Sequence, residues 1–453
     1  MRNVRQIALV LTLVTFAAGL PAAAPENTLV WNKSKDLVDA DVRTLSLMPL
    51  LEQIAAATGW QVLVEPGTTH TASSKFKSLP SGEALRLLLG DLNFALLPQT
   101  NASPKLYVFR TAMRRATQLV RAKPAKPRRV PNELIVRVKP GTDVEQLARK
   151  LGAKVLGRIP GLNAYRLQFD DATATNAARD QLAQNSDVTD VGYNYYFDPP
   201  QPSSGLLASS ASPLSLQLKP PGDSGRIIVG LVDTGVQSLG PNLDDFLLKP
   251  ISVAGDSQLD SSSPTHGTAM AETILSSLAA VTKGTTSTQI LPVDVYGADA
   301  TTTTWNVAQG IVAAVNGGAN VLNLSLGGTG DSPVLRDLIQ SVIDRGIPIF
   351  AAAGNEPVAT PFFPAAYPNV IAVTAEEQGR IANYANFGSF VSVAAPDSSV
   401  VYYNNRPWFV VGTSASTAYT TGMAAGLAAT SNNNWKQVQS IILSTLPVPG
   451  SGK

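Results

Sequence analysis

Three short segments, far apart in the sequence, carry side chains that together could do chemistry. They are Asp233-Thr234-Gly235, His266-Gly267-Thr268 and Gly412-Thr413-Ser414. His266 is one of only two histidines among 453 residues, so the chain offers few candidate bases that titrate near neutrality. Hydrolysis of an amide through serine needs a hydroxyl nucleophile, such a base, and a carboxylate that fixes the tautomer of the base. The segments therefore predict a serine protease with Asp233, His266 and Ser414 as catalytic residues.

Each segment also has a simpler interpretation. Asp-Thr-Gly is the tripeptide of aspartic proteases too, but their chemistry needs two carboxylates that share a proton. The chain holds a single Asp-Thr-Gly, so a homodimer would have to supply the second carboxylate. Gly-Thr-Ser alone is a common loop sequence, and the pair Gly354-Asn355 alone is a common turn. The order Asp, His, Ser along one chain favours the serine protease over each of these.

The residues from Arg226 to about Pro449 alternate between strand-like and helix-like stretches. Apolar stretches rich in β-branched residues lie at 227–232, 290–295, 321–324, 347–352 and 370–373, with helical stretches such as 305–315 and 334–345 between them. This pattern predicts an α/β fold with a parallel sheet covered on both faces, in which ligands bind at the carboxyl ends of the strands. Asp233 directly follows the first strand, and His266 and Ser414 each precede a run of small residues. We expect the three side chains to meet at one rim of the sheet.

Five segments resemble, in the same order, the signature segments of the subtilisin-like serine proteases. They are 233–235, 266–268, 323–328 (Asn-Leu-Ser-Leu-Gly-Gly), 352–355 (Ala-Ala-Gly-Asn) and 412–416 (Gly-Thr-Ser-Ala-Ser). The resemblance implies a three-layer subtilisin-like catalytic domain over 226–453, in which Asn355 and the backbone N–H of Ser414 stabilise the oxyanion. It also implies a substrate cleft lined by Ser325, Leu326 and Gly327 together with Ala352, Ala353 and Gly354. A peptide substrate is expected to lie there in extended form.

The sequence departs from this family pattern at several positions without losing a catalytic group. Glu272 replaces a small residue after the histidine segment and is expected to crowd its helix. Ala415 stands where methionine is usual, so the site should resist oxidation to a sulfoxide. Because of Glu272 and the compact domain, a catalytically silent binding scaffold is one alternative to an active enzyme. Glu356, next to Asn355, suggests a preference for basic side chains before the cleaved bond.

The predicted chemistry requires no cofactor. The loop acids Asp256, Asp260 and Asp299 are scattered, so the sequence does not support a structural calcium site. Charged residues make up 15% of the chain and the net charge is +2, which favours no nucleic-acid partner. Cysteine is absent, which excludes disulfides and a thiol nucleophile. The expected partners are peptide or protein substrates and the chain's own propeptide.

The N-terminal residues predict export. Residues 1–24 combine Arg2 and Arg5 with an apolar run at 7–20 and small residues at 22–24, which is the pattern of a secretory signal peptide. The apolar run is short for a bilayer span, so an uncleaved anchor is the less favoured alternative. A periplasmic or extracellular location is expected.

Two small α+β domains are predicted before the catalytic domain. Residues 25–110 contain a helix near 47–55, a strand at 60–65, a helix near 85–89 and a strand at 106–109. This order resembles the short N-terminal domain of secretins and TonB-dependent receptors. The resemblance implies an envelope partner, and docking to it is a second alternative for the main function. Residues 111–131 are rich in arginine, lysine and proline and are expected to form an exposed linker.

The second small domain covers residues 132–198 and has the pattern of two βαβ halves. Strands are expected at 133–138, 165–169 and 188–196, and helices at 144–151 and 174–184. Directly before a subtilisin-like domain, this arrangement looks like the propeptide of that family, a ferredoxin-like inhibitor whose C-terminal tail enters the active-site cleft. Residues 199–225 are rich in Ser, Pro and Gly and are expected to be a linker with the processing site. The sequence thus predicts a secreted serine endopeptidase made as a zymogen.

Overall fold

The computed structural model describes residues 27–32, 35–65, 67–98, 104–116, 118–120, 127–197, 205–206, 214–221, 225–257, 259, 262–382, 384–432 and 434–450. The predicted signal peptide, part of the basic linker and most of the linker at 199–225 lie outside these residues. Among the helices that are described, none combines the length and hydropathy needed to cross a bilayer. The chain divides into two compact units, one with Met1–Leu50 and Thr69–Asp91 and the other with Leu51–Thr68 and Leu92–Lys453.

In the first unit, a helix packs with an antiparallel sheet. The strands β1 (Thr28–Asn32), β2 (Leu37–Ser46) and β4 (Thr71–Pro80) pair in the order β1-β2-β4. The helix α2 (Ser81–Leu89) follows β4 and buries Leu85, Leu88 and Leu89, as its leucine spacing predicts. The indole N–H of Trp31 donates to the Ser81 hydroxyl at 2.8 Å, which ties β1 to the start of α2.

The helix α1 (Leu47–Thr58) confirms the helix expected near 47–55. After it, the strands β3 (Gln61–Val64), β5 (Asn93–Leu97), β6 (Lys105–Phe109) and β7 (Gln118–Val120) form a sheet in the order β5-β6-β3-β7. The 3-10 helix η1 (Met113–Arg115) and β7 lie within the segment expected to be a linker. A strand of three residues has too short a pattern to be recognised from sequence.

The next domain is a β-α-β-β-α-β unit with an antiparallel sheet. Its elements are β8 (Arg129–Val138), α3 (Val144–Lys150), β9 (Lys154–Ile159), β10 (Ala164–Gln168), α4 (Ala172–Leu182) and β11 (Val188–Phe197). Its strands pair in the order β11-β8-β10-β9, which is the ferredoxin-like arrangement. Asp143 and Asp171 cap the two helices by accepting a backbone N–H in the first turn. The structure confirms every element expected here and adds β9.

The third domain is built on a parallel sheet. Its strands are β14 (Ile228–Asp233), β15 (Ile251–Ser252), β17 (Gln289–Asp294), β19 (Val321–Leu324), β20 (Ile349–Ala352), β21 (Ile371–Glu377), β22 (Arg380–Ile381) and β23 (Val393–Pro396). They pair in the order β15-β17-β14-β19-β20-β21-β22, with β23 also on β21, and only the short β22 is antiparallel among these described pairs. The central strands are buried on both faces, as their continuous apolar sequences predict.

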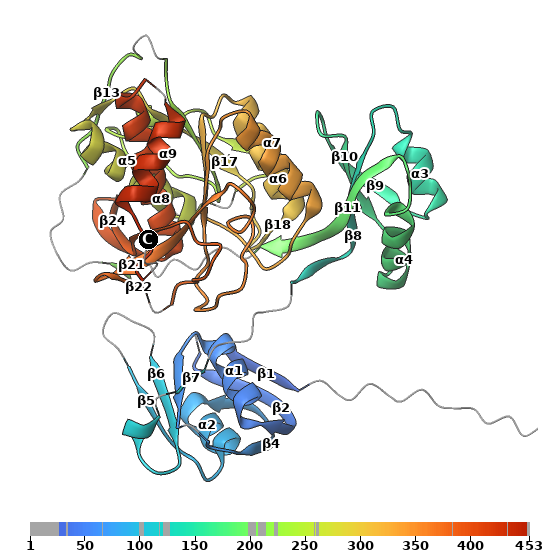
Figure 1. Cartoon of the computed structure of the whole chain (residues 1–453), viewed down its shortest axis with the longest axis vertical. Coiled ribbons are helices and arrows are strands. Elements are labelled where there is room, and N and C mark those ends of the chain that lie inside the picture. The colour runs from blue at the N-terminus through green and yellow to red at the C-terminus, as the bar shows by residue number, and fades with distance from the viewer. Residues whose placement is uncertain are drawn as a thin grey trace, which may run out of the picture. The chain divides into compact units, whose positions relative to one another are not determined.

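Helices cover the two faces of this sheet and form a separate core on each. The helices are α5 (His266–Thr282), α6 (Thr304–Asn316), α7 (Pro333–Asp344), α8 (Thr413–Thr430) and α9 (Trp435–Thr445). One core contains Ile311 of α6 and Leu335 of α7, and the other contains Ile274 of α5 and Ala424 of α8. Figure 1 shows α6 and α7 on one side of the sheet and α5, α8 and α9 on the other. The predicted three-layer α/β fold is therefore confirmed.

Short elements complete the domain. They are the 3-10 helix η2 (Asp244–Phe246) and the strands β12 (Gly205–Leu206), β13 (Gln217–Leu218), β16 (Thr285–Thr286), β18 (Thr302–Thr303), β24 (Ser398–Tyr403) and β25 (Arg406–Val411). β12 and β13 lie in the segment expected to be an irregular linker, and they pair with β25 and β16. β24 and β25 form a hairpin whose Asn404 and Asn405 both have positive φ, at 51° and 57°. Two such residues in a two-residue loop match the right-handed twist of the strands.

Candidate active site

Asp233 and His266 meet at the carboxyl end of the sheet. Asp233 is the last residue of β14 and His266 is the first residue of α5, and both are buried. The Nδ1 atom of His266 lies 2.7 Å from Oδ1 of Asp233. Because an ionised carboxylate can only accept, this bond calls for a proton on Nδ1, and in the neutral imidazole Nε2 is then an acceptor. Nε2 of His266 is buried and has no hydrogen-bond partner among the described residues.

Residues next to Asp233 and His266 interlock and hold the pair in place. The N–H of Gly267 donates to the Thr234 hydroxyl at 2.8 Å, and a Cβ at position 267 would lie 2.3 Å from the Thr234 carbonyl oxygen. Only glycine allows this approach. Thr265 caps α5 by accepting the N–H of Thr268. The segments 233–235 and 266–268 therefore pack against each other through a small residue, Gly267, and a hydroxyl-bearing residue, Thr234.

Ser414 lies in the first turn of α8, which runs beside α5. A Cβ on Gly422 would lie 2.2 Å from the Ile274 carbonyl oxygen, and the Ser277 hydroxyl donates to the Tyr419 carbonyl at 2.7 Å. Farther along, a Cβ on Gly426 would lie 2.7 Å from Cβ of Val281, so these close contacts advance in the same direction along both helices. The helices are therefore parallel, and their N-terminal ends lie at the same edge of the sheet. The tertiary structure thus brings Ser414 to the end of the domain that holds His266.

The Ser414 hydroxyl is hydrogen bonded to a neighbour other than His266. It donates to the Ser325 carbonyl oxygen at 3.2 Å, while the Ser325 hydroxyl donates to the Ser414 carbonyl at 3.1 Å. Of the two bonds that link a serine, histidine and aspartate triad, the structure forms the one between Asp233 and His266. Catalytic hydrogen bonds are often long or absent in free enzymes and form when substrate binds.

Asn355 is oriented with its amide N–H₂ available as a donor. Its Oδ1 accepts both the backbone N–H and the hydroxyl of Thr413, each at 2.9 Å. Since those two donors occupy the oxygen, the amide nitrogen remains as the donor group of this side chain. The Nδ2 atom would lie 3.2 Å from a Cβ at Gly412, whose φ of 139° is one that other residues rarely adopt. The amide of Asn355 therefore lies at the start of α8, the helix that holds Ser414.

The residues predicted to line the substrate cleft follow two adjacent strands. Ser325, Leu326 and Gly327 come directly after β19, while Ala352 ends β20 and is followed by Ala353 and Gly354. The side chains of Leu326 and Ala353 are fully buried in the structure. Gly327 and Gly354 both lie against the ring of Phe362, which the sequence did not single out. The amide of Asn323 donates to the Ser325 hydroxyl at 2.9 Å and so links β19 to the start of this segment.

The end of the ferredoxin-like domain reaches these cleft residues. Its last strand β11 pairs antiparallel with β18, with Tyr196 opposite Thr303 and Phe197 opposite Thr302. Phe197 is fully buried, and a Cβ at Gly328 would lie 2.8 Å from its ring. Sequence reasoning missed Phe197, because its partner Thr302 is 105 positions away along the chain.

A polar group fixes the contact between this domain and the catalytic domain. Asn194 is fully buried, accepts the backbone N–H of Trp305 at 3.1 Å and donates to the Glu133 carboxylate at 2.8 Å. Trp305 lies in the first turn of α6, where backbone N–H groups lack partners within the helix. Asn194 therefore helps to cap a helix of the other domain.

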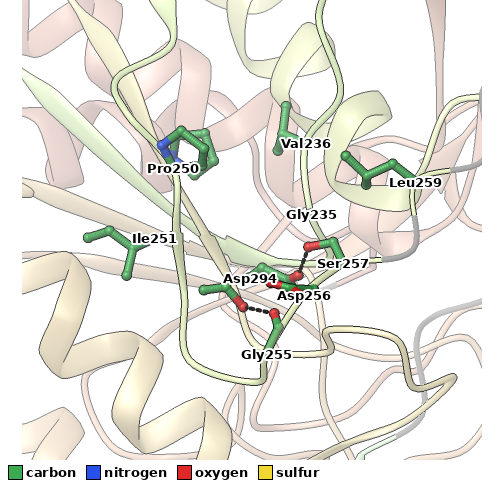
Figure 2. A pocket seen from close by; sticks show the side chains of 11 residues that line it. Gly235, Val236, Pro250, Ile251, Gly255, Asp256, Ser257, Leu259 and Asp294 are labelled. Atoms are coloured by element: carbon green, nitrogen blue, oxygen red, sulfur yellow. Dashed lines mark hydrogen bonds between the residues drawn. The ribbon is translucent and has the colours of Figure 1, made fainter.

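A small cavity lies beside Gly235, two residues after Asp233. It has a volume of about 200 Å³, and its wall includes Asp256, Ser257 and Asp294 (Figure 2). Figure 2 shows the Ser257 hydroxyl directed at the Asp294 carboxylate, to which it donates. The other Asp294 oxygen accepts the backbone N–H groups of Tyr296 and Gly297 at 2.8 and 3.0 Å. Asp294 thus anchors the loop around Ser257 over Gly235.

The remaining residues singled out from the sequence lie outside this arrangement. Glu356 is exposed, and its backbone N–H donates to Asn386 at 2.8 Å. Glu272 is 3% exposed and does not break its helix, because α5 continues through it to Thr282. Within the described residues, no group of three His, Cys, Asp or Glu side chains is placed to hold a metal ion. Asp260, one of the loop acids considered for calcium, lies outside those residues.

Comparisons with known proteins agree with this geometry. The model of the Subtilase family matches residues 224–451, and that of the Fervidolysin N-terminal prodomain matches residues 116–194. The thermophilic serine proteinase of Bacillus sp. (strain AK1) is 33% identical over 239 residues, which are 51% of this chain and 59% of that protein. Thermitase of Thermoactinomyces vulgaris is 30% identical over 231 residues, which are 49% of this chain and 82% of thermitase.

The fold is also similar to that of solved structures. The crystal structure of fervidolysin from Fervidobacterium pennivorans, described as a keratinolytic enzyme related to subtilisin, aligns with a TM-score of 0.54 and 19% sequence identity. The alignment covers 69% of this chain and 56% of fervidolysin. The chain therefore spans a little more than half the length of fervidolysin and of the Bacillus proteinase that it matches.

Proposed function

The chain belongs to the subtilase family, and we propose that it is an exported serine endopeptidase made as a zymogen. In this proposal Ser414 is the nucleophile, His266 is the general base, and Asp233 is the carboxylate that orients the base. The observation that carries the proposal is the 2.7 Å bond from His266 Nδ1 to Asp233. Nε2 has no partner among the described residues and lies at the end of the domain where α8 places Ser414, so in the neutral imidazole it is free to accept a proton.

The proposed reaction follows from these positions. The Ser414 oxygen attacks the carbonyl carbon of the peptide bond as its proton passes to Nε2 of His266. Asp233 stabilises the imidazolium that forms and does not itself take the proton. The negative charge on the carbonyl oxygen is stabilised by the Asn355 amide and the backbone N–H of Ser414. His266 then protonates the leaving amine, and water releases the acyl group from Ser414 by the same steps in reverse.

The ferredoxin-like domain is proposed to inhibit the enzyme until it is cut away. The pairing of β11 with β18 places Phe197 beside Gly328, next to the segment proposed to bind substrate. Cleavage within 199–225 would separate the two domains, whose contact is then held by noncovalent bonds such as that of Asn194 with Trp305.

Labelling with a fluorophosphonate tests the catalytic assignment. Such a reagent modifies a serine only when a base and an oxyanion site activate it. We expect the processed protein to be labelled, the Ser414→Ala variant to be unlabelled, and Ser416→Ala to be labelled as a control within the same helix. Absence of labelling in the processed protein would support the catalytically silent scaffold instead.

N-terminal sequencing of the secreted protein tests export and processing together. We expect a new N-terminus after Phe197 and within 199–225, and no such product from the Ser414→Ala variant. A product from Ser414→Ala would mean that another protease does the cutting.

Substrate preference can be tested with a peptide library. Comparison of the native enzyme with Glu356→Gln shows whether this exposed carboxylate favours basic residues before the cleaved bond.

A further inference from the structure

A cavity lies beside Glu272 of α5. Its volume is about 430 Å³. Its wall is formed by Leu214, Ser238, Leu239, Gly240, Pro241, Asn242, Leu243, Glu272, Tyr402, Tyr403, Asn404 and Asn405. Glu272 carries the only carboxyl group among these residues, and it is 3% exposed. The cavity therefore combines one enclosed carboxylate with neutral walls.

The Glu272 carboxylate is only half satisfied. Its Oε1 accepts the backbone N–H of Tyr402 in β24, which among the described residues is an edge strand of the sheet β12-β25-β24. Figure 1 shows β24 beside α5 and α8. Oε2 is buried and has no hydrogen-bond partner among the described residues. Burial raises the pKa of Glu272 to about 7, and the bond from Tyr402 opposes that rise.

The protein supplies no cation to this carboxylate from the elements packed against α5. These elements are β14, β16, β24 and α8, and none of them contains lysine or arginine. The titratable groups that they bring are the carboxylate of Asp233 and the phenols of Tyr402, Tyr403 and Tyr419. A buried carboxylate costs free energy unless it is paired or protonated. These described elements offer Glu272 no cation, so its carboxyl group either keeps a proton or pairs with a cation from another source.

The walls of the cavity fit an organic cation better than a metal ion. Leu214, Leu239 and Leu243 present apolar surface, and the amides of Asn404 and Asn405 sit on a tight turn that the hairpin holds in place. Calcium takes six to eight oxygen ligands, usually from several carboxylates. The cavity wall holds one carboxylate, and the described residues contain no cluster of metal-binding side chains.

From this arrangement we infer that the cavity binds a primary ammonium group on an aliphatic stem, with the ammonium at Glu272 and the stem against the leucines. Either a free alkylamine or a lysine side chain has this chemistry. The site is separate from the catalytic residues and does not depend on peptidase activity. Glu272 lies six residues after His266 on α5, which corresponds to about 9 Å along the helix axis.

Binding is coupled to a proton. Below pH 7 the carboxyl group of Glu272 is mostly protonated, so an ammonium ion binds as that group releases its proton to the buffer. We expect close to one proton released per ligand at pH 6 and almost none at pH 8.5. The apparent Kd should fall about tenfold for each pH unit between pH 5 and 7 and then level off.

Calorimetric titration of the full-length Ser414→Ala protein tests the inference, because this variant avoids self-digestion. The probes are n-butylammonium and N-acetyl-lysine amide, with n-butanol and calcium chloride as comparisons. Each titration is repeated in two buffers of different ionisation enthalpy, which gives the number of protons released. Binding of n-butylammonium with the expected proton release supports the site, and binding of the lysine derivative as well identifies a peptide side chain as a source.

Two variants complete the test. Glu272→Gln should lose at least tenfold in affinity and release no proton, while Glu377→Gln, a partly exposed carboxylate on β21, should match the parent protein. Leu239→Trp should block binding by filling the cavity even if Glu272→Gln fails to fold. The inference is overturned if no ammonium probe binds, if n-butanol binds equally well, if only calcium binds, or if binding persists without proton release.

Discussion

Replacement of Glu272 by glutamine should make the catalytic domain more stable at alkaline pH and leave its stability at acidic pH nearly unchanged. The carboxylate is enclosed by α5 and β24, and burial raises its pKa to about 7 from an ordinary value of 4.5. A glutamine keeps the shape and the acceptor for the Tyr402 N–H, but it carries no charge to bury. The substitution therefore isolates the cost of ionising this side chain inside the fold.

The sign follows from proton linkage. Because the folded-state pKa lies above the unfolded value, the folded protein holds its proton more tightly than the unfolded chain between pH 4.5 and 7. The stabilisation is fully present below pH 4.5, falls as the pH rises, and is lost above pH 7. The difference between the two pKa values corresponds to about 3 kcal/mol. Glu272→Gln should remove this loss from the pH profile of the free energy of unfolding.

Urea denaturation at intervals from pH 4 to pH 9 measures the effect, with every protein also carrying Ser414→Ala and with no amine in the buffer. We expect Glu272→Gln to gain up to about 3 kcal/mol over the parent between pH 4.5 and 8. Glu377→Gln serves as the control, since its carboxylate is only partly buried. Parallel profiles for the parent and Glu272→Gln would refute the reasoning, because they would show that Glu272 ionises as easily inside the fold as outside it.

Three further outcomes are expected. Gly422→Ala should destabilise the domain by about 1–3 kcal/mol, because its Cβ would lie 2.2 Å from the Ile274 carbonyl; an unchanged Tm would contradict the close contact of α5 and α8. Asn355→Leu should lower kcat about 10²–10³-fold with little change in KM on a chromogenic peptide; a loss below tenfold would exclude the oxyanion role. Asn194→Ala should weaken the binding of the cleaved prodomain to the enzyme by about 1–3 kcal/mol, because it leaves the N–H of Trp305 unpaired. An unchanged inhibition constant would show that this contact is dispensable.

Local sequence patterns were sufficient for much of the fold. The continuous apolar strands around Asp233 predicted a buried parallel sheet, and the structure confirms it. The helix and strand order of residues 132–198 predicted the ferredoxin-like unit, which the structure also contains. The strand β7 was missed, because three residues show little periodicity. The edge strand β9 was also missed, and only one of its six residues is buried.

For the site, the sequence determined which residue types could act and in what order they occur. Asp233, His266 and Ser414 could be named because histidine is rare in this chain and all three stand in recognisable segments. Glycines and threonines of these segments are needed for packing, as Gly267 against Thr234 shows. The bond between Asp233 and His266 then agrees with the predicted pairing. The identity of these residues could be predicted because each segment is recognisable from its own few residues.

Only the tertiary structure decided which groups from distant segments lie together. It places Phe197 against Gly328, bonds the Ser414 hydroxyl to Ser325, and encloses Glu272 beside a cavity made by loops from three parts of the chain. Glu272 was expected to crowd its helix, but its side chain instead accepts a hydrogen bond from β24. Contacts of this kind depend on the packing of elements that lie 89 or more residues apart, and no local pattern of residue types encodes them.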